Sequence, residues 1–189
     1  MYLEKKAFTL FELIVAISIV MILMMMTFAP YSYFQNKAKL KLSAREISQS
    51  FYEARNMAVS WIKDINWNKS IWIYMTTNQP DNNKIIFFSY PYNIDENSIN
   101  NIELWDTKIL KIKLLQDGIK INDLWGSNSV LFFYNSIYWE SKIYSFDTIP
   151  KTEITLDEIS IIFSFKNATT ANLRKELIYF KGTNIVDYK

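Results

Sequence analysis

The sequence contains no histidine and no cysteine, and it has only three glycines in 189 residues. Without histidine and cysteine there is no Ser-His-Asp or Cys-His catalytic site, no imidazole or thiolate metal site, and no disulfide. The glycines, Gly118, Gly126 and Gly182, are too few and too scattered for a glycine-rich phosphate-binding loop. The composition therefore favours a protein that is not an enzyme, and we expect no cofactor and no metal ion.

A large excess of either charge is also absent. Lys and Arg number 21 and Asp and Glu number 19, which gives a formal net charge of +2. This balance argues against a strongly basic nucleic-acid-binding protein and against an acidic tail. Half of the residues are apolar and 16% are aromatic, which suffices for one packed domain.

What the sequence does contain is one long apolar run near its amino terminus. Of residues 8–29, 18 are apolar, and no charged residue occurs in residues 13–36. A 22-residue helix is about 33 Å long, which matches the hydrocarbon core of a bilayer. The run therefore predicts a single membrane-spanning helix, preceded by a short leader that ends in Lys5 and Lys6.

Glu12 is the exception within this run, because a carboxylate costs about 2.5 kcal/mol or more near the centre of a bilayer and less near its edge. Such a residue suggests a function that requires a cationic partner. Three other interpretations of the segment remain: a cleaved secretory signal peptide, a plain membrane anchor, and a buried core helix. The length of the run and the poor cleavage site at residues 27–29 argue against the first, the unexplained carboxylate against the second, and the nearly uniform apolar surface against the third.

Residues 5–15, with the sequence KKAFTLFELIV, resemble the processing signal of type IV prepilins and type II secretion pseudopilins. The resemblance implies that a prepilin peptidase cleaves the chain between Ala7 and Phe8 and methylates the new amino terminus of Phe8. It also places Glu12 at the fifth position of the mature chain, where this family keeps an intramembrane carboxylate. Two departures are visible: Ala7 stands where the family usually has glycine, and Pro30 lies one position later than the usual proline.

In this interpretation Glu12 pairs with the α-ammonium group on Phe8 of a neighbouring subunit, which offsets the desolvation of a lone carboxylate. The resemblance implies three partners: the prepilin peptidase, other pilin or pseudopilin subunits, and an inner-membrane assembly platform. It further implies a single-pass protein of the bacterial inner (cytoplasmic) membrane, with its head outside the cytoplasm, that enters a pilus or pseudopilus filament. Charge counting alone does not give this orientation, because Lys37, Lys39 and Lys41 follow the span.

A second apolar pattern follows the span. Six apolar residues are spaced alternately by four and three positions: Leu40, Ala44, Ile47, Phe51, Ala54 and Ala58. This spacing predicts one buried stripe on a helix that ends near Ser60, with a kink or local opening at Pro30. Residues 54–58, with the sequence ARNMA, are similar to the corresponding helix end in the GspH/FimT group of minor pseudopilins and minor pilins.

After residue 70 the apolar pattern changes to a period of two, which indicates β-strands. Nine strands are expected, at residues 71–77, 84–90, 108–115, 119–122, 130–134, 137–144, 159–165, 177–180 and 184–188. Asp117-Gly118 predicts a two-residue hairpin turn with positive φ between the third and fourth strands. Further turns are expected at residues 81–83, 135–136 and 181–183, and a flexible insertion at residues 91–101.

Together these patterns predict an α+β protein. A long amino-terminal helix, transmembrane in its first half and amphipathic in its second, is expected to pack on a carboxyl-terminal, antiparallel, β-rich and sandwich-like head. The expected divisions are a removed leader at residues 1–7, a transmembrane and assembly helix at 8–35, an amphipathic helix at 36–62 and the head at 63–189. The predicted function is that of a minor pilin or pseudopilin, a structural subunit of a type II secretion pseudopilus or a type IV pilus.

Two alternatives to this structural role remain. In the first, a DNA-uptake or adhesion pilin, the head binds DNA or a surface ligand; in the second, a membrane-anchored periplasmic protein does not assemble. The candidate DNA contacts are cations near the carboxyl end: Lys166, Arg174, Lys175, Lys181 and Lys189. Glu176 and Asp187 are interspersed among them, which argues against nucleic acid as a partner.

Overall fold

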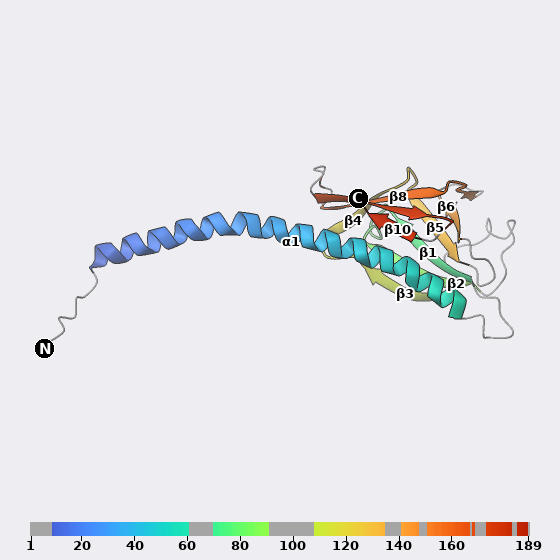
Figure 1. Ribbon diagram of the computed structural model, residues 1–189, viewed down its shortest axis with the longest axis horizontal. Coiled ribbons are helices and arrows are strands. Elements are labelled where there is room, and N and C mark those ends of the chain that lie inside the picture. The colour runs from blue at the N-terminus through green and yellow to red at the C-terminus, as the bar shows by residue number, and fades with distance from the viewer. Residues whose placement is uncertain are drawn as a thin grey trace. The chain divides into compact units, whose positions relative to one another are not determined.

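The computed structural model of the chain describes residues 9–60, 70–90, 108–134, 141–147, 151–166, 168, 173–182 and 185–188 (Figure 1). Its contacts divide the chain into two units, residues 1–38 and residues 39–189. One helix, α1 (Leu10–Ser60), belongs to both units, and ten strands follow it within the described residues. The predicted α+β layout, a long amino-terminal helix followed by an antiparallel β head, is therefore confirmed.

Helix α1 continues through Pro30, as the sequence predicts. Proline removes one backbone N–H donor, but the residues on both sides of it are apolar or helix-competent and the helix resumes at once. The helix ends at Ser60, where the hydroxyl donates a hydrogen bond to the carbonyl oxygen of Met57 at 3.0 Å. The described helix thus reaches the predicted end near Ser60, and residues 61–69 lie outside the described residues.

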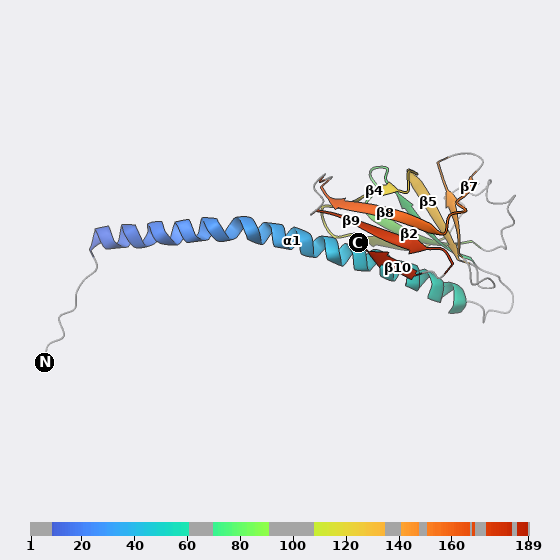
Figure 2. The ribbon, with the colours of Figure 1, turned by 45° about the horizontal axis from the view of Figure 1, so that its top comes forward.

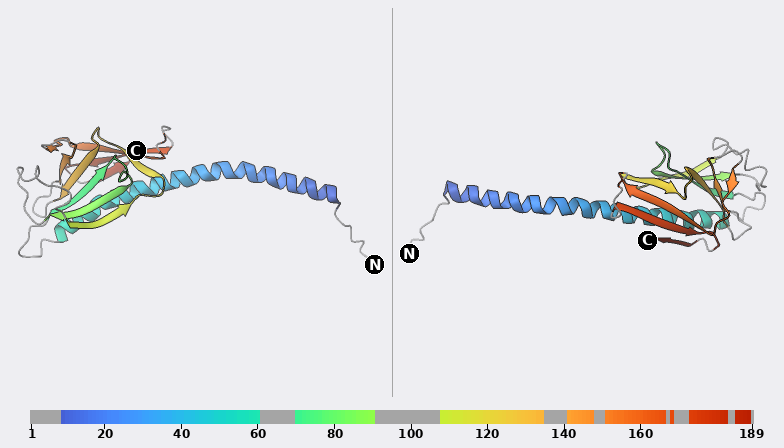
Figure 3. Two further views of the ribbon diagram at one scale, coloured as in Figure 1. Left: turned by 180° about the vertical axis from the view of Figure 1, so that it is seen from behind. Right: turned by 90° about the horizontal axis from the view of Figure 1, so that it is seen from above.

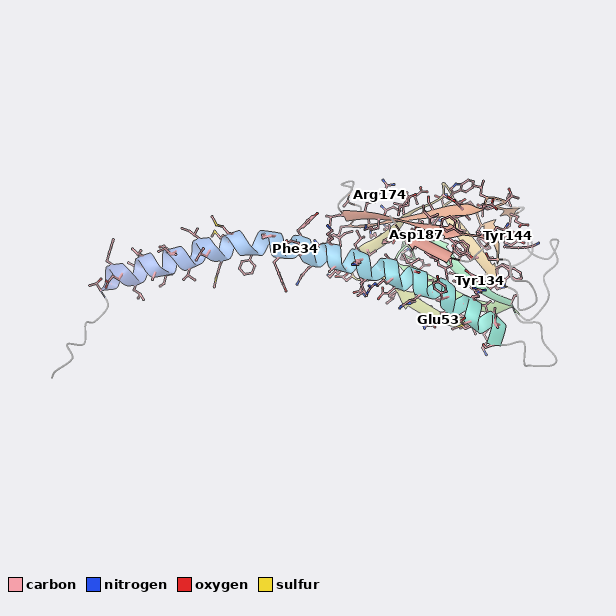
Figure 4. All side chains as sticks on the ribbon, viewed as in Figure 1. Phe34, Glu53, Tyr134, Tyr144, Arg174 and Asp187 are labelled. Atoms are coloured by element: carbon pink, nitrogen blue, oxygen red, sulfur yellow. The ribbon has the colours of Figure 1, made fainter. Side chains whose placement is uncertain are left out.

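In the first unit, the large apolar side chains of α1 stand out from the helix on all sides, Phe34 among them (Figure 4). Their exposed fractions range from 36% for Tyr33 to 78% for Leu10. By length and composition, α1 is the one helix in the described part of the chain that can cross a membrane. An apolar surface on every side is typical of a span surrounded by lipid or by other helices.

The second unit contains two antiparallel sheets (Figures 2 and 3). The six-stranded sheet has the order β3-β2-β1-β5-β6-β7, and the four-stranded sheet has the order β10-β9-β8-β4. The strands of the first sheet are β1 (Ser70–Thr76), β2 (Lys84–Tyr90), β3 (Lys108–Leu114), β5 (Ser129–Tyr134), β6 (Ser141–Ser145) and β7 (Thr152–Glu153). Those of the second sheet are β4 (Ile119–Leu124), β8 (Glu158–Phe165), β9 (Arg174–Phe180) and β10 (Ile185–Tyr188).

The main core lies where the second half of α1 meets both sheets. All six residues of the predicted stripe are buried, with exposed fractions of 0 to 2%. The ring of Phe51 lies 4.8 Å from that of Phe132 on β5 and 4.7 Å from that of Tyr179 on β9, between ring centroids. The head therefore folds around one face of the helix, and the predicted stripe is confirmed.

A second apolar cluster lies on the other face of the six-stranded sheet. It comprises Trp72, Phe88, Leu131, Phe133 and Tyr144. The ring centroids of Trp72 and Phe133 are 4.6 Å apart. Strands β1 and β5 are consequently buried on both faces, which explains why their sequences, SIWIYMT and SVLFFY, are almost continuously apolar and do not alternate.

The predicted hairpin at Asp117-Gly118 is wrong, although the turn itself is present. Gly118 has φ +82°, and the amide of Ile119 donates to the carbonyl oxygen of Gln116 at 2.9 Å. However, β3 pairs with β2 and β4 pairs with β8, so the turn carries the chain from one sheet to the other. The reason lies in burial: β4 turns Ile119 and Ile121 into the core, whereas β3 is largely exposed.

The other strand predictions differ from the structure mainly at their ends. Strand β9 begins at Arg174, three residues earlier than predicted, and β4 extends to Leu124. The sequence missed β7, which has only two residues and pairs with β6. The turn at residues 81–83 is confirmed. Several predicted segments lie wholly or partly outside the described residues: 61–62, 91–101, 135–140 and 183–184.

Candidate membrane and assembly site

Thr9 and Glu12 together begin α1. The backbone amide and the hydroxyl of Thr9 each donate a hydrogen bond to Oε2 of Glu12, both at 2.9 Å. In return, the amide of Glu12 donates to Oγ1 of Thr9 at 3.3 Å. This reciprocal arrangement is a capping box, in which Thr9 is the N-cap and Glu12 the third helical residue.

The capping box gives Glu12 a local role that sequence reasoning missed. The signal was present, because the spacing Thr-x-x-Glu before an apolar run is the sequence pattern of this motif. A carboxylate in the first turn also interacts favourably with the positive end of the helix dipole. Both hydrogen bonds from Thr9 reach Oε2 of Glu12, so the carboxylate is hydrogen-bonded within its own chain at the start of the helix.

The predicted cleavage residues, Ala7 and Phe8, lie outside the described residues. In sequence, Phe8 immediately precedes the N-cap Thr9, and Glu12 follows three residues after that cap. Removal of residues 1–7 leaves both Thr9 and Glu12 in the chain, so the residues that form the capping box are the same before and after such a cut.

The span itself holds one further polar group whose hydrogen bond is defined. The hydroxyl of Ser18 donates to the carbonyl oxygen of Ile14 at 2.8 Å, within the same helix. A hydroxyl that bonds back to its own helix does not need water or a second helix. Ser18 is thus compatible with a lipid environment, and Glu12 stays the one ionisable group of residues 9–36 apart from Tyr31 and Tyr33.

Aromatic residues mark the carboxyl-terminal end of the span. Residues 13–32 make a helix about 30 Å long, the thickness of a hydrocarbon core. Tyr33 and Phe34 follow directly, with exposed fractions of 36% and 65% and ring centroids 6.1 Å apart. Tyrosine and other aromatic side chains are enriched at membrane–water interfaces. Their position fits a span that begins at Glu12 and ends near Ser32.

In the head, the cations proposed for DNA contacts have different surroundings. Lys181 forms an ion pair with Glu153 at 3.2 Å and also donates to the carbonyl oxygen of Ile154. The ammonium group of Lys166 lies 5.4 Å from the centroid of the Phe165 ring. Arg174 lies at the end of the head opposite Tyr144 (Figure 4). Lys189 is outside the described residues.

A buried hydroxyl cluster joins the two sheets. Tyr134 donates to the hydroxyl of Tyr179 at 3.2 Å, and the hydroxyls of Ser141 and Tyr179 are 2.6 Å apart. Burial raises the pKa of Tyr134 well above its usual value, and the nearby Tyr179 adds to this effect. Burial also raises the pKa of Tyr179, although its hydrogen bonds to Ser141 and Tyr134 oppose the shift.

The described residues contain no group of three or more potential metal ligands among His, Cys, Asp and Glu.

Comparison with known proteins identifies the amino-terminal segment. Residues 4–28 match the family model of the prokaryotic N-terminal methylation motif. No curated protein and no solved structure matches the chain. The matched residues include Ala7, Phe8, Thr9 and Glu12, together with most of the apolar half of α1. The chain therefore carries the prepilin-type amino-terminal motif of type IV pilin-like proteins, on a helix suited to anchor it in a membrane.

Proposed function

We propose that the protein is a minor pilin or pseudopilin subunit of a type IV pilus or a type II secretion pseudopilus, similar to the GspH/FimT group. Prepilin peptidase cleaves it between Ala7 and Phe8 and methylates Phe8. The chain then sits in the bacterial inner membrane with its head outside the cytoplasm, until the assembly platform incorporates it into a filament. The methylation motif on a single apolar helix carries this proposal.

Glu12 is the residue that favours a filament subunit over a plain membrane anchor. An anchor needs only the apolar surface, whereas an acidic residue in the span is an energetic cost that calls for a function. Cleavage creates a positive charge on Phe8, four residues before Glu12 and at a similar depth in the membrane. The ammonium group of a neighbouring subunit can then bind the carboxylate, which sets how far one helix is shifted along the next.

The head has a structural and non-catalytic role in this proposal. The buried hydroxyl groups of Tyr134, Ser141 and Tyr179 bond to one another and join the two sheets. Of the candidate DNA-binding cations, Lys181 is held in an ion pair with Glu153. Arg174 pairs in register with Ser164, two residues from Lys166, whose ammonium group lies over the Phe165 ring. The proposed function requires the head to contact neighbouring subunits through its exposed surface. It does not require a ligand pocket.

The first test is the intact mass of the full chain extracted from membranes of cells that have an active prepilin peptidase. We expect a chain that begins at Phe8 and carries one added methyl group. A chain that still begins at Met1 contradicts the processing step. The matched control is Ala7→Asp in the same cells, which replaces the small residue before the cut and which we expect to leave the leader in place.

The second test separates the charge of Glu12 from its role as a helix cap. Glu12→Gln keeps a side chain that suits a capping box but removes the charge, whereas Thr9→Ala removes the cap and keeps the charge. We expect both variants to insert and to be processed. Glu12→Gln should fail to co-purify with filaments, and Thr9→Ala should reduce co-purification much less. Normal incorporation of Glu12→Gln contradicts the proposed assembly role.

A further inference from the structure

A row of cations follows the aromatic end of the span on one side of α1. Lys37, Lys41 and Arg45 come at intervals of four residues, and all three side chains are exposed. Residues four apart are neighbours on the surface of a helix, so the three side chains lie in line. We call Lys37, Lys41 and Arg45 the basic row. Tyr33, four residues before Lys37, begins the same line.

The basic row has no counter-charge within the described residues. None of its three cations forms an ion pair there, whereas the ion pairs that are defined hold lysines of the head. No acidic residue occurs in residues 13–45, and the next one, Glu46, accepts a hydrogen bond from Gln116 at 2.8 Å. Like charges four residues apart on a helix repel each other. An anion from outside the chain would offset this repulsion.

The basic row begins where the headgroup layer of a membrane is expected. The hydrocarbon core is about 30 Å thick and the whole bilayer about 40–45 Å, which leaves about 5–8 Å for the headgroups on each side. Because α1 is one continuous helix, depth along it follows from residue number, at about 1.5 Å per residue. If the hydrocarbon ends near Ser32, Lys37 lies about 8 Å beyond it. Lys41 lies about 14 Å beyond it and Arg45 about 20 Å.

We propose that the basic row binds the headgroups of anionic phospholipids at the surface of the membrane that α1 spans. Side chains on a helix lean toward its amino terminus, which here directs the ammonium group of Lys37 back toward the headgroups. An anionic surface attracts nearby Lys and Arg, and the attraction falls off within a Debye length of about 8 Å. Lys37 lies beside the headgroups, Lys41 within about one Debye length of them and Arg45 beyond it. The contribution to binding therefore declines along the row.

The position of the row favours a lipid surface over a soluble anion. The exposed rings of Tyr33 and Phe34 mark the membrane interface directly before it. In the orientation of the proposed function the row lies outside the cytoplasm, the side on which Lys and Arg are usually sparse next to a span. Cations at that place need a favourable contact of their own, and an anionic headgroup supplies it. The inference rests on the membrane placement of the first half of α1 and goes beyond the proposed filament role.

The test uses the full chain in phospholipid vesicles. Because the chain has no cysteine, Gln35→Cys introduces a single thiol for a fluorescent donor beside the row. Phosphatidylglycerol and phosphatidylcholine, each with the same acceptor on an acyl chain, report by energy transfer how strongly each lipid gathers around the donor. We expect the anionic lipid to be enriched about fivefold or more, the factor that corresponds to one cation near an anionic surface. Equal energy transfer to the two lipids overturns the inference.

The graded depth of the row gives a second test in the same vesicles. Lys37→Gln should lower the enrichment most, Lys41→Gln less and Arg45→Gln least. Lys108→Gln removes an exposed cation of β3 and is the matched control, which should leave the enrichment unchanged. Equal losses in the three variants of the row, or the same loss in the control, overturn the inference, because net charge and not depth would then decide.

Two further measurements separate a membrane surface from other anions. Added sodium chloride should reduce the enrichment, because salt screens exposed charges. Excess inorganic phosphate at constant ionic strength should leave it unchanged. If phosphate removes the enrichment at constant ionic strength, the row binds free phosphate and the inference is overturned.

Failure of the lipid contact is distinguishable from failure of the proposed function, because the vesicle test requires neither cleavage nor other subunits. A chain that gathers anionic lipid but is never incorporated into filaments overturns the proposed function alone. A chain that is processed at Phe8 and recovered with filaments, but shows no preference between the two lipids, overturns the lipid contact alone.

Discussion

The two halves of α1 have the same secondary structure but opposite surroundings. Before residue 39 the large apolar side chains are exposed on every side, for example Phe28 at 68%. After it, six apolar residues form one stripe that is 0 to 2% exposed, and only a few others, Leu42, Tyr52 and Val59, are exposed among the described residues. The first half is thus apolar without a partner in its own chain, whereas the second half has its partner in the two sheets of the head.

This difference shows how each half contributes to stability. Burial of an apolar side chain stabilises a fold only if the chain itself removes that side chain from water. The stripe on the second half is buried in this way, so the head depends on it. The first half has to be covered by lipid or by other subunits, and its apolar residues should affect insertion and assembly without changing the stability of the head.

The largest expected loss of stability comes from truncating a phenylalanine in the second half of α1, and the same change in the first half is its control. Phe51→Ala removes the ring that lies against Phe132 and Tyr179, and a buried Phe→Ala change costs about 3–5 kcal/mol. Phe28→Ala, the matched control, should leave the unfolding of the head unchanged. Denaturant unfolding of the full chain in detergent, followed by tryptophan fluorescence, measures both. Equal losses of stability in the two variants would contradict the proposed difference between the two halves of α1.

The next effect concerns the turn that ties β3 and β4 to the second half of α1. The amide of Gln116 in this turn donates to the hydroxyl of Ser43 on the helix at 3.3 Å. In Gly118→Ala, the new methyl group would lie 2.7 Å from Cε2 of Phe165 at a residue with φ +82°. We expect a loss of about 1–3 kcal/mol, from strain and the close contact together.

Gly126→Ala is the control for this prediction, because its φ is also positive but no heavy atom lies within 4 Å of the new methyl group. It isolates the backbone strain of a left-handed conformation, which we expect to cost about 1–2 kcal/mol. Thermal unfolding of both variants gives the comparison. Equal losses at Gly118 and Gly126 would mean that contact with Phe165 contributes nothing.

The third effect is a loss of stability at alkaline pH that is confined to the second unit. Burial raises the pKa of Tyr134 and Tyr179 above the value of about 10 in an unfolded chain. Above pH 10 the unfolded chain therefore loses protons that the folded head keeps, so stability is complete below pH 10 and falls as the pH rises. The free energy of unfolding should fall by up to about 1.4 kcal/mol per pH unit for each tyrosine.

Unfolding curves at pH 9 and pH 11 measure this effect, and Tyr134→Phe serves as the control. The variant loses one buried hydroxyl, so its stability should depend less steeply on pH than that of the original chain. An equal pH dependence in the two proteins would contradict the assignment of the alkaline loss to Tyr134.

The smallest effect concerns an ion pair on the side of α1. Lys111 on β3 lies 2.5 Å from Glu53 on the second half of the helix, and both side chains are partly exposed. Exposed pairs of this kind contribute about 0.2–1 kcal/mol and weaken with salt. Lys111→Gln should therefore lower stability by no more than about 1 kcal/mol at low salt. Lys84→Gln, which breaks a pair within the turn to β2, is the control that leaves the helix contact intact.

The features that the sequence predicts well are those with a strong local period. The stripe from Leu40 to Ala58 follows directly from the 3.6-residue helix repeat, and the long span follows from an uncharged run. The end at Ser60 and the passage through Pro30 also depend on local chemistry. Strand β2 was predicted with its bounds because polar turn residues adjoin it at residues 81–83.

The features that the sequence did not predict depend on contacts between distant residues. Asp117-Gly118 encodes a turn, but which strands pair on either side of it depends on β2 and β8, which lie far away in the chain. The spacing of Thr9 and Glu12 is the sequence pattern of a capping box, but the interpretation of Glu12 as an intramembrane carboxylate did not include this local role. The positive φ of Trp125 in the turn from β4 to β5 has no local signal, because a Trp-Gly pair is not a usual sequence for such a turn.

The order in which the chain visits the two sheets has a consequence for how the head folds. The chain builds β1 to β3 in one sheet, crosses to β4, returns for β5 to β7, and crosses again for β8 to β10. Strand β4 therefore has no partner until β8 is available, about 40 residues later. Pairings so distant in sequence form slowly, because long loops must close first. The membrane half of α1 can insert early, but the stripe on its other half is only partly covered until the last strands, which include Tyr179, arrive.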